Sequence, residues 1–383
     1  MTLGELGLKV CVVTKVLAPG GAEELVVSQL KAASKATDDQ YVLLVVFGWK
    51  DDYIARVEEL GVEVIRILEQ SDWRRLLWPA LLLLTLFRQA PNLVHTHSPS
   101  VAIVARLAPF LTFRRRRTVG HVYTEHNIWE NRHRLVQIGL RLTSRLDSAR
   151  FACSAGVRAS LPPGIRSDTE VLRHGIDVVG VRRSALGRDE AQEVLGLPGA
   201  VRRGMVVGMV AGFRPEKRHD VAVEAAQIVC SSLSGVSFVA IGGGATYAQT
   251  ETLVSLLGLE DRFVLAGKVD QASRMMRAFD LLMLSSDAEG LPVVIMEAFA
   301  LGIPVVATDV GGVSELVNDN VNGLLVTPGS ALELAQAVTR FAGDTTFRAA
   351  ASEDGLRTAS DMSADATAEL LSNRYHTLTE IDR

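Results

Sequence analysis

The sequence predicts an α/β protein with two doubly wound parallel sheets, one in each half of the chain. Short runs rich in Val, Ile and Leu alternate with helical-looking segments in both halves, which is typical of parallel βαβ units. Residues 176–203, with scattered Gly and no sustained apolar period, separate the halves and predict a hinge. A chain of 383 residues is too long for one ordinary core and suits two domains.

The apolar runs of the first half predict five strands, at residues 9–16, 41–47, 62–67, 93–96 and 118–124. Segments 22–36 and 73–88 predict helices between them. In the second half, strands are predicted at residues 205–210, 236–241, 262–266, 281–284, 304–308 and 323–326. Helices are predicted at residues 221–233, 246–257 and 331–342, and one linking helix at residues 188–195. Each half therefore predicts one Rossmann-like domain.

Composition excludes several classes of protein. Charged residues make up 22% and the formal net charge is −4, which argues against a nucleic-acid-binding protein. Three cysteines without a Cys-x-x-Cys spacing, Cys11, Cys153 and Cys230, predict neither a disulfide framework nor a zinc site. The apolar run 76–87 is interrupted by Pro79 and is short of the ~20 residues that cross a bilayer. With no secretory leader evident, we expect a cytoplasmic protein.

Two carboxylates, Glu289 and Glu297, lie eight positions apart across a predicted strand-to-helix junction. The helix opens near Pro292 and ends at Gly302, and nearly every other side chain in it is apolar. A buried carboxylate needs a bonding partner, and a ligand hydroxyl is one candidate for Glu297. The alternative is that Glu289 is a surface acid and that Glu297 pairs with a structural Arg.

The loop that holds Glu289 follows a strand, at the edge where open α/β sheets bind ligands. The N–H groups of Val293 and Val294 at the start of the helix could hold an anion there. Arg214, Lys217 and Arg218 follow the strand 205–210 and could stabilise a departing diphosphate, although in isolation they would read as a solvated loop.

A Gly20-Gly21 turn precedes the first predicted helix, and such glycines let backbone N–H groups approach a phosphate or a sugar. A plain tight turn is equally consistent with this pair. The turn is not Gly-x-Gly-x-x-Gly, so a dinucleotide dehydrogenase loses its main support.

Histidines cluster in the first half. His95 and His97 follow the fourth predicted strand, and a spacing of two would place both on the same face. His121, His126 and His133 lie around the end of the fifth strand. No third ligand and no Asp-x-Asp accompany the His95/His97 pair, so no metal site is predicted. His126 is the candidate functional histidine, with a structural role as the alternative.

Residues 285–300 resemble the Glu-x7-Glu signature of retaining GT-B glycosyltransferases, specifically family 4 (glycosyltransferase group 1). Segments 302–308 and 311–317 continue the pattern. Weaker matches lie at residues 94–99, 124–126, 153–157, 174–177, 242–244 and 267–269. The resemblance extends from residue 9 to about residue 328 and thus covers most of the chain.

The resemblance implies a GT-B architecture, in which two Rossmann-like domains face each other across a cleft. Residues 1–177 would bind the acceptor and residues 178–363 the nucleotide-sugar donor. The C-terminal helix, residues 364–383, would cross back to the first domain.

The resemblance also implies roles for individual residues. Glu289 would bond hydroxyls of the donor sugar and Glu297 the ribose, while His126 would point at the sugar near the acceptor. Lys217 matches the family's Arg-x4-Lys loop, but Gly212 stands where the family Arg usually is, so Arg214 is the candidate substitute. The remaining predicted substrate-binding residues are Gly20 and Gly21 over the diphosphate, Val269 beside the nucleobase, and Gly290, Leu291, Pro292, Val293 and Val294.

The predicted activity is a retaining, metal-independent transfer of a sugar from a nucleotide diphosphate to an acceptor hydroxyl, with no cofactor. The acceptor would be a glycan, a glycolipid or a small molecule. Alternatives are a nucleotide-sugar epimerase of the same fold, a phosphorylase with pyridoxal phosphate, or a non-catalytic nucleotide-sugar-binding protein. Four consecutive cations, Arg114, Arg115, Arg116 and Arg117, follow apolar residues 109–113 and predict a contact with an anionic membrane surface, unless they form a solvated loop.

Overall fold

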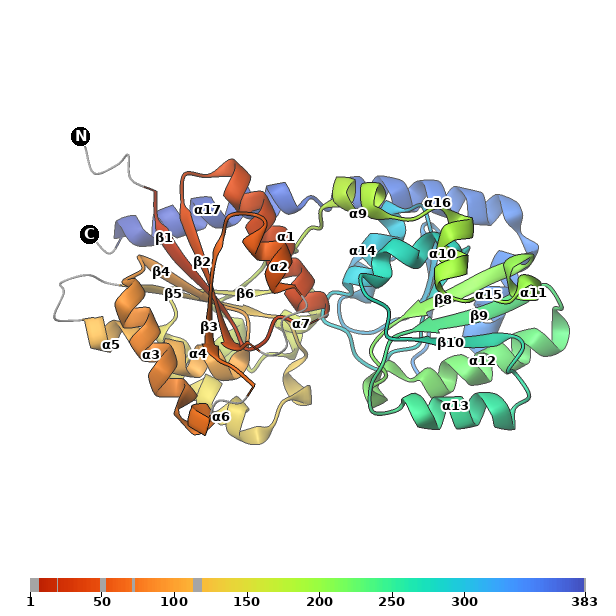
Figure 1. The fold of residues 1–383 in the computed structure, drawn as a ribbon, viewed down its shortest axis with the longest axis horizontal. Helices are drawn as coiled ribbons and strands as arrows, with labels where there is room; N and C mark the ends of the chain where they lie inside the picture. Colours follow the sequence, from red (N-terminus) through yellow and green to blue (C-terminus); the bar gives the residue numbers. More distant parts are fainter. Residues whose placement is uncertain (1–6, 19, 49–52, 71–72, 113–118, 382–383) are drawn as a thin grey trace. The chain divides into compact units, whose positions relative to one another are not determined.

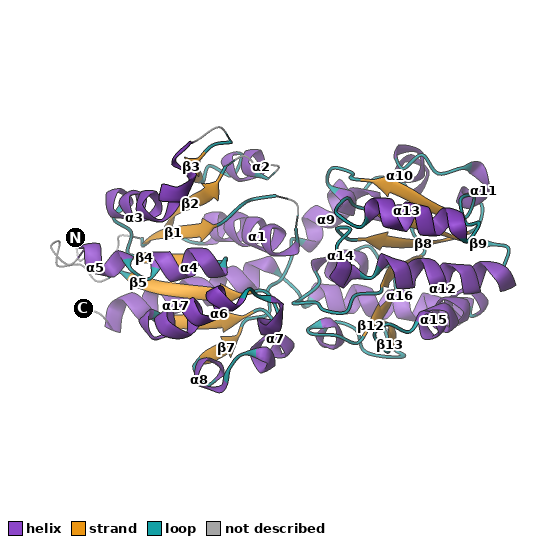
Figure 2. Cartoon of the chain, turned by 90° about the horizontal axis from the view of Figure 1, so that it is seen from below, coloured by secondary structure: helices purple, strands orange, loops and turns teal. Residues whose placement is uncertain are grey.

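The computed structural model describes residues 7–18, 20–48, 53–70, 73–112 and 119–381 of the chain. The polypeptide forms two compact units. Unit 1 comprises Met1–Asp177 and Ser363–Arg383, and unit 2 comprises Val178–Met362. Each unit contains one parallel β-sheet with helices on both faces (Figures 1 and 2).

The sheet of unit 1 has seven strands in the order β3-β2-β1-β4-β5-β6-β7. The strands are β1 (Lys9–Thr14), β2 (Gln40–Phe47), β3 (Glu63–Leu68), β4 (Leu93–Thr96), β5 (Gly120–Glu125), β6 (Ala149–Ala152) and β7 (Thr169–Val171). The first five match the predicted strands to within a few residues. The prediction omitted β6 and β7, which pair at the edge of the sheet and are only four and three residues long.

Strands β1 and β2 of unit 1 are buried on both faces, which explains their nearly continuous apolar sequences. In β1, Val10 and Val12 pack into one core and Cys11 and Val13 into the other, as the two-residue period of a strand requires. The first core is covered by α1 (Gly21–Ala36), α2 (Ile54–Glu58) and α17 (Ala364–Ile381). The second is covered by α3 (Trp78–Gln89), α4 (Pro99–Ala105) and α5 (Ala108–Thr112). Further along the chain come α6 (Arg134–Thr143), α7 (Ala155–Ser160) and α8 (Pro163–Arg166).

Helix α17 belongs to unit 1, although it is formed by the last residues of the chain. Leu371 and Tyr375 are buried in the same core as β1 and α1. The Tyr375 hydroxyl lies 2.5 Å from Nδ1 of His95, and Ser372 donates to Asp39 at 3.0 Å. The chain therefore leaves unit 1 after Asp177 and returns to it at Ser363.

The sheet of unit 2 has six strands in the order β10-β9-β8-β11-β12-β13. They are β8 (Met205–Val210), β9 (Val236–Ile241), β10 (Phe263–Gly267), β11 (Leu281–Leu284), β12 (Val305–Thr308) and β13 (Gly323–Val326). All six strands were predicted. The main helices are α12 (His219–Ser232), α13 (Tyr247–Leu256), α14 (Val293–Ala300), α15 (Ala331–Gly343) and α16 (Thr345–Ser360).

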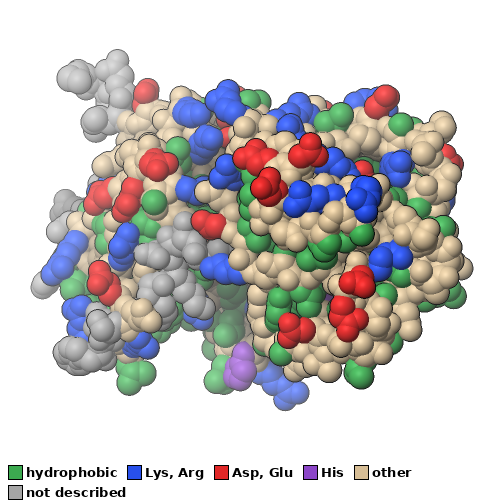
Figure 3. Space-filling view, turned by 45° about the vertical axis from the view of Figure 1, so that its right-hand side comes forward, with side chains coloured by type: hydrophobic (Ala, Val, Ile, Leu, Met, Phe, Trp, Pro, Cys, Tyr) green, Lys and Arg blue, Asp and Glu red, His purple; other side chains and the backbone are tan. Residues whose placement is uncertain are grey.

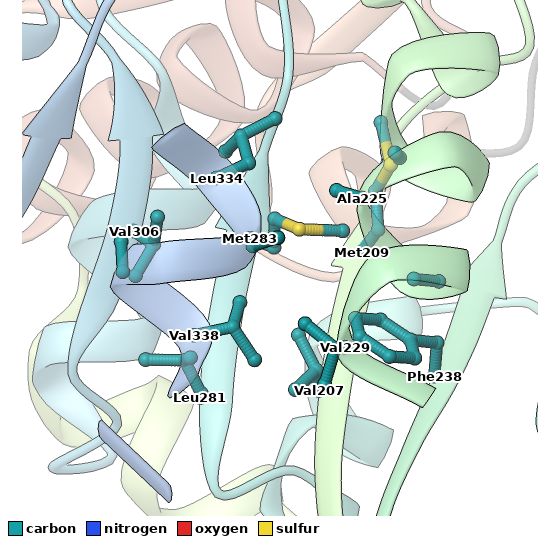
Figure 4. Packing of buried hydrophobic residues seen from close by; sticks show 14 of the residues in the cluster. Val207, Met209, Ala225, Val229, Phe238, Leu281, Met283, Val306, Leu334 and Val338 are labelled. Carbon is teal, nitrogen blue, oxygen red and sulfur yellow. The ribbon is translucent and has the colours of Figure 1, made fainter. Parts of the chain in front are cut away.

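A single apolar core joins one face of this sheet to its helices (Figure 4). Met209 of β8, Met283 of β11 and Val229 of α12 all belong to this core. Val338 of α15 packs into the same core. The core positions the carboxyl ends of the strands, from which the candidate site is built.

The segment predicted as a hinge with one helix contains three helices instead. They are α9 (Val178–Ser184), α10 (Arg188–Val194) and α11 (Gly199–Arg202), and all three belong to unit 2. The predicted helix 188–195 corresponds to α10. Arg188 forms a bidentate ion pair with Asp280 at 2.8–2.9 Å, which attaches α10 to the residue before β11.

The surface mixes charges of both signs on the face that Figure 3 shows, where Lys and Arg side chains lie among Asp and Glu side chains. Within the described ranges, no helix has the length and apolar character needed to span a membrane. The predicted basic run, Arg114 to Arg117, lies outside the described residues.

Candidate functional site

The predicted donor-site residues of unit 2 gather at one edge of its sheet. Because all six strands are parallel, the loops after their carboxyl ends share that edge. The loop after β8 carries Lys217, the loop after β11 carries Glu289, and Val269 follows β10 as a half-buried residue. The edge thus brings together residues far apart in the sequence.

Lys217 and Glu289 form a bidentate ion pair at the centre of this edge. The Nζ atom of Lys217 lies 2.7 Å from Oε1 and 2.8 Å from Oε2 of Glu289. The Ser286 hydroxyl also donates to Oε1, at 2.7 Å. The side chains of Lys217 and Glu289 are only 15% and 8% exposed, so each charge depends on the other for compensation. The surface-acid alternative for Glu289 is therefore wrong.

The loop that presents Glu289 is anchored from both sides. The Ser285 hydroxyl donates to the carbonyl oxygens of Lys217 and Arg218, at 2.9 and 2.8 Å. Thr308, at the end of β12, donates to the Ser286 carbonyl at 2.6 Å. Gly311 packs so closely that a Cβ there would overlap the Glu289 carbonyl oxygen. These contacts fix the position of the ion pair.

Helix α14 begins directly after this loop. Pro292 is its N-cap at φ −73°, one residue earlier than the predicted first-turn position, and Val293 opens the helix. The helix ends in a Schellman motif, in which the N–H of Gly302, at φ +71°, bonds to the Phe299 carbonyl. Glu297 is half-buried, whereas most neighbouring positions of α14 are buried. Its carboxylate is therefore more accessible than the all-apolar pattern suggested.

Arg214 lies beside the position where the family cation is absent. Its Nε atom is 3.5 Å from where a Cβ of Gly212 would stand. The Arg214 side chain is 61% exposed and lies 3.4 Å from a carboxylate oxygen of Glu216. Gly212 itself has room for a side chain, unlike Gly242 and Gly244, at which a Cβ would overlap backbone of residues 211 and 213.

Arg218, the third predicted cation, is engaged elsewhere. It forms ion pairs with Asp220 at 2.9 Å and with Asp287 at 3.1 Å. Hydrogen bonds to these carboxylates raise the pKa of Arg218 above its ordinary value. Arg218 lies in the loop after β8 and Asp287 in the loop after β11, so their ion pair holds the two loops together.

In unit 1, the Gly20-Gly21 turn lies at the start of α1. Gly20 is the N-cap, in extended backbone, and Gly21 is the first helical residue. The carboxylate of Glu23 lies directly against Gly20, where a Cβ would overlap it.

Four buried histidines lie together at the carboxyl ends of the unit 1 strands. His95 and His97 lie on the same face, as predicted, with ring centroids 4.2 Å apart. His97 Nδ1 lies 3.0 Å from Nε2 of His126. The His126 ring lies 5.4 Å from that of His174, centroid to centroid. His126 thus belongs to a packed cluster rather than standing alone.

These histidines are neutral at neutral pH. Burial lowers the pKa of His95, His97 and His126 well below the ordinary value, and the neighbouring histidines lower it further. Burial also lowers the pKa of His174 to about 4. His126 can therefore donate or accept a hydrogen bond but carries no charge.

A separate polar network in unit 1 has a structural role. The Asp147 side chain, which is fully buried, accepts from Arg106 at 2.7 Å and contacts Nδ1 of His121 at 2.7 Å. A cavity lined by Arg106 and Tyr123 adjoins this network and has room for about one water molecule. It is too small for a nucleotide sugar.

Several residues at the edge of unit 2 and in the histidine cluster of unit 1 were not predicted from the sequence. Ser286 lies in the matched segment, three positions before Glu289, and a hydroxyl at that spacing in a turn was an available signal. His174 was noted only as part of a weak match. Tyr375 is 280 positions from His95, and no local pattern indicates their contact. Among the residues that the structure describes, no group of three or more His, Cys, Asp or Glu side chains is arranged to hold a metal ion.

The two Rossmann-like units have the predicted GT-B fold class, which solved structures confirm. The structure of Anabaena HepE in complex with UDP and glucose matches with a TM-score of 0.81 over 97% of this chain and 100% of that one, at 22% identity. Two family models also match: "Glycosyl transferases group 1" over residues 199–357 and "Glycosyltransferase Family 4" over residues 19–179. The two models match different halves of the chain, and both describe glycosyltransferases.

Curated relatives match over part of their length. The putative teichuronic acid biosynthesis glycosyltransferase TuaC of Bacillus subtilis is 30% identical over 216 residues, 56% of this chain and 52% of the relative. The D-inositol 3-phosphate glycosyltransferase of Salinispora arenicola is 32% identical over 221 residues, 54% of this chain and 49% of the relative. The chain thus spans about half the length of these relatives.

Proposed function

We propose that this protein is a retaining glycosyltransferase that moves a sugar from a nucleotide-diphosphate sugar to an acceptor hydroxyl. The observation that carries the proposal is the Lys217–Glu289 pair at the ligand-binding edge of unit 2. The two matched family models support the same reaction, because both describe glycosyltransferases.

In this proposal the bound donor separates the ion pair and becomes the new bonding partner of both Lys217 and Glu289. Hydroxyls of the sugar bond to Glu289, and the diphosphate approaches Lys217. Since both side chains are largely buried, neither charge is stable without a partner, and the donor supplies both. Glu297, half-buried on α14, is the proposed partner of the ribose.

The proposed transfer breaks the bond between the anomeric carbon and the terminal phosphate oxygen. Lys217, Arg214 and the N–H groups of Val293 and Val294 stabilise the negative charge on the departing diphosphate. The acceptor oxygen bonds to the anomeric carbon on the same face, and its proton passes to the leaving phosphate. The products are a glycoside of unchanged anomeric configuration and a nucleoside diphosphate.

The acceptor is proposed to bind unit 1 near His126. Because His126 is neutral and already bonded to His97, its role would be to hold a hydroxyl by a hydrogen bond. Gly20 and Gly21 are proposed to contact the diphosphate through backbone N–H groups. The predicted membrane contact of residues 114–117 stays a prediction.

Arg214 favours a catalytic protein over a purely binding one. The family Arg is missing at Gly212, which raises the non-catalytic alternative. However, the Arg214 side chain occupies the space next to Gly212, so the loop keeps a cation close to the usual position. Leaving-group stabilisation therefore has a source in this chain.

The test begins with a thermal-shift screen of UDP-, GDP- and ADP-linked sugars, because a ligand of the folded state raises stability by mass action. The donor that shifts the protein is then incubated with acceptors, and the anomeric configuration of the product is read by NMR. Retention of configuration, with turnover unchanged by EDTA, supports a retaining reaction that needs no metal. Inversion, or metal-dependent turnover, contradicts those two parts.

Two outcomes would identify the rival functions. Isomerisation of the donor without an acceptor would indicate an epimerase. Donor binding without transfer or hydrolysis would indicate a binding protein.

A further inference from the structure

Two histidines of the unit 1 cluster each have a buried ring nitrogen without a hydrogen-bond partner. They are His97 and His174, and in both rings the unpartnered atom is Nε2. A buried polar atom without a partner costs free energy, and a proton on that atom makes the arrangement rarer. The contacts of the other nitrogen in each ring therefore indicate where the proton lies.

His174 is the simpler of the two rings. Its Nδ1 atom lies 3.1 Å from the carbonyl oxygen of Leu172. Because a carbonyl oxygen only accepts hydrogen bonds, Nδ1 of His174 carries the proton. Burial lowers the pKa of His174 to about 4, so the ring is neutral at neutral pH and its Nε2 atom has no proton. The buried unpartnered atom of this ring is thus an acceptor.

His97 has a choice between two tautomers. Its Nδ1 atom lies 3.0 Å from Nε2 of His126, and one of these nitrogens donates to the other. If His126 donated, Nε2 of His97 would be a buried N–H group without an acceptor. If His97 donates, that atom is an acceptor without a donor, as in His174. Unpartnered buried N–H groups are rarer in proteins than under-satisfied acceptors, so the contacts favour a proton on Nδ1 of His97.

This direction of donation fixes the tautomer of His126. Its Nε2 atom accepts from His97, so in the neutral ring the proton lies on Nδ1. Within the part of the chain that the structure describes, no group bonds to Nδ1 of His126, and this atom is not among the buried unpartnered ones. His126 therefore keeps an available N–H donor, while His97 occupies the lone pair of its ring.

The ring of His97 is itself held by packing. His95 lies against it, with ring centroids 4.2 Å apart. Both nitrogens of His95 are bonded, Nδ1 to the Tyr375 hydroxyl at 2.5 Å and Nε2 to the Thr124 hydroxyl at 2.7 Å. His95 cannot turn without breaking both bonds, so it restricts the rotation of His97. Such support keeps a functional side chain in one geometry.

We propose that His97 is a positioning residue that fixes the Nδ1–H tautomer of His126, so that His126 donates a hydrogen bond to a substrate oxygen and does not act as a base. This role rests on the proposed function, in which a substrate hydroxyl lies at His126. A hydroxyl or ring oxygen of a sugar has the lone pair that this donor requires, whereas an ammonium group does not. Since His126 takes no proton, the proton of the acceptor hydroxyl is left for the departing phosphate.

NMR of the full-length protein with isotope-labelled histidines tests the tautomer without any substrate. Hydrogen–nitrogen correlation spectra distinguish a protonated ring nitrogen from an unprotonated one, and single-histidine variants assign the signals. At neutral pH we expect a proton on Nδ1 and none on Nε2 in His97, His126 and His174. A protonated Nε2 in His97, or a mixture of tautomers in His126, would overturn the proposal whatever the activity.

Two variants separate positioning from packing. His97→Phe keeps a ring of similar shape but removes the donor, and we expect kcat/KM for the acceptor to fall about tenfold. His97→Asn keeps a side-chain N–H near the position of Nδ1 and should recover most of this loss. Equal kcat/KM values in the two variants would contradict the assigned role of His97.

His121→Asn is the control for general damage to unit 1. The side chain of His121 is buried and bonds to Asp147 and Thr96 rather than to the other histidines. We expect a lower urea midpoint, an unchanged His126 tautomer and nearly wild-type kcat/KM. A loss of kcat/KM as large as in His97→Phe would assign both losses to destabilisation and overturn the proposal. Absence of transfer by the wild type would count against the proposed function alone, because the NMR spectra still decide the tautomer.

Discussion

The two units share a fold class and differ in what lies at the carboxyl ends of their strands. In unit 2 that edge holds a pair of opposite charges, Lys217 and Glu289. Glycines of the loops around this pair pack closely against neighbouring backbone. In unit 1 it holds neutral histidines packed ring to ring. The parallel sheet therefore supplies only the edge at which the loops meet. The loops decide whether it suits a charged diphosphate or an uncharged hydroxyl.

The largest expected effect comes from removing the charges of unit 2. Glu289→Gln or Lys217→Ala should lower kcat by about 100-fold to 1,000-fold, the cost of losing one oriented polar contact in a transition state. Steady-state kinetics with the donor from the thermal-shift screen measures this. Glu251→Gln, an exposed carboxylate on α13, is the control. Near-native turnover in both site variants would show that the edge of unit 2 is not catalytic.

Stability must be separated from activity in these variants. Lys217→Ala leaves the Glu289 carboxylate without its cation, which by itself destabilises unit 2. The double variant Lys217→Met with Glu289→Gln removes both charges and should regain stability but not activity. Recovery of turnover in the double variant would contradict the assigned roles.

The histidine cluster should make unit 1 sensitive to acid. His174 has its pKa lowered to about 4 in the folded protein, against an ordinary value of 6.5. Between these two pH values the unfolded chain holds more protons, so the free energy of unfolding falls as the pH falls from 6.5 towards 4. The loss attributable to His174 alone is on the order of 3 kcal/mol.

Tryptophan fluorescence can follow this loss in unit 1 alone. All four tryptophans, at positions 49, 73, 78 and 129, lie in the first half of the chain. Urea unfolding at pH 7 and pH 4.5 should give a lower midpoint in acid, and His174→Gln should reduce the difference. An unchanged midpoint in the wild type would mean that protonation of the cluster does not lower the free energy of unfolding.

A smaller effect distinguishes the glycines of unit 2. Gly244→Ala should cost about 1 to 3 kcal/mol, because its φ of +152° and the adjacent backbone exclude a Cβ. Gly212→Ala should change the free energy of unfolding by less than about 0.5 kcal/mol, since its surroundings are open. Thermal unfolding compares the two variants directly. Equal costs would contradict the difference in backbone conformation and space between the two glycines.

Much of this fold follows from local sequence patterns. Buried parallel strands are apolar throughout, and eleven such runs could be read from the sequence because each spans at least four residues between helical segments. Strand β7 has only three residues, and α11 has only four, so neither shows a period. Local pattern therefore fails where an element is too short to show two repeats of its own period. Strand β6 has four residues, but Arg150 interrupts its apolar sequence.

The site was predictable to a similar degree. Glu289 and Lys217 could be named because each follows a strand in a parallel sheet, and parallel sheets gather such residues at one edge. Their direct pairing could not be read from the sequence, since it depends on loop conformations that Ser285 and Thr308 fix. The histidine cluster depends on Tyr375, which only the tertiary fold brings to His95.

Because α17 belongs to unit 1, the two units are completed in a different order from that in which they begin to be synthesised. Unit 2 is a continuous segment and holds all its residues once position 362 has been translated. Unit 1 contains the first residues of this sequence but lacks Leu371 and Tyr375, which complete its core, until position 375 has been translated. The half of the protein that emerges first from the ribosome is therefore the half that finishes folding last.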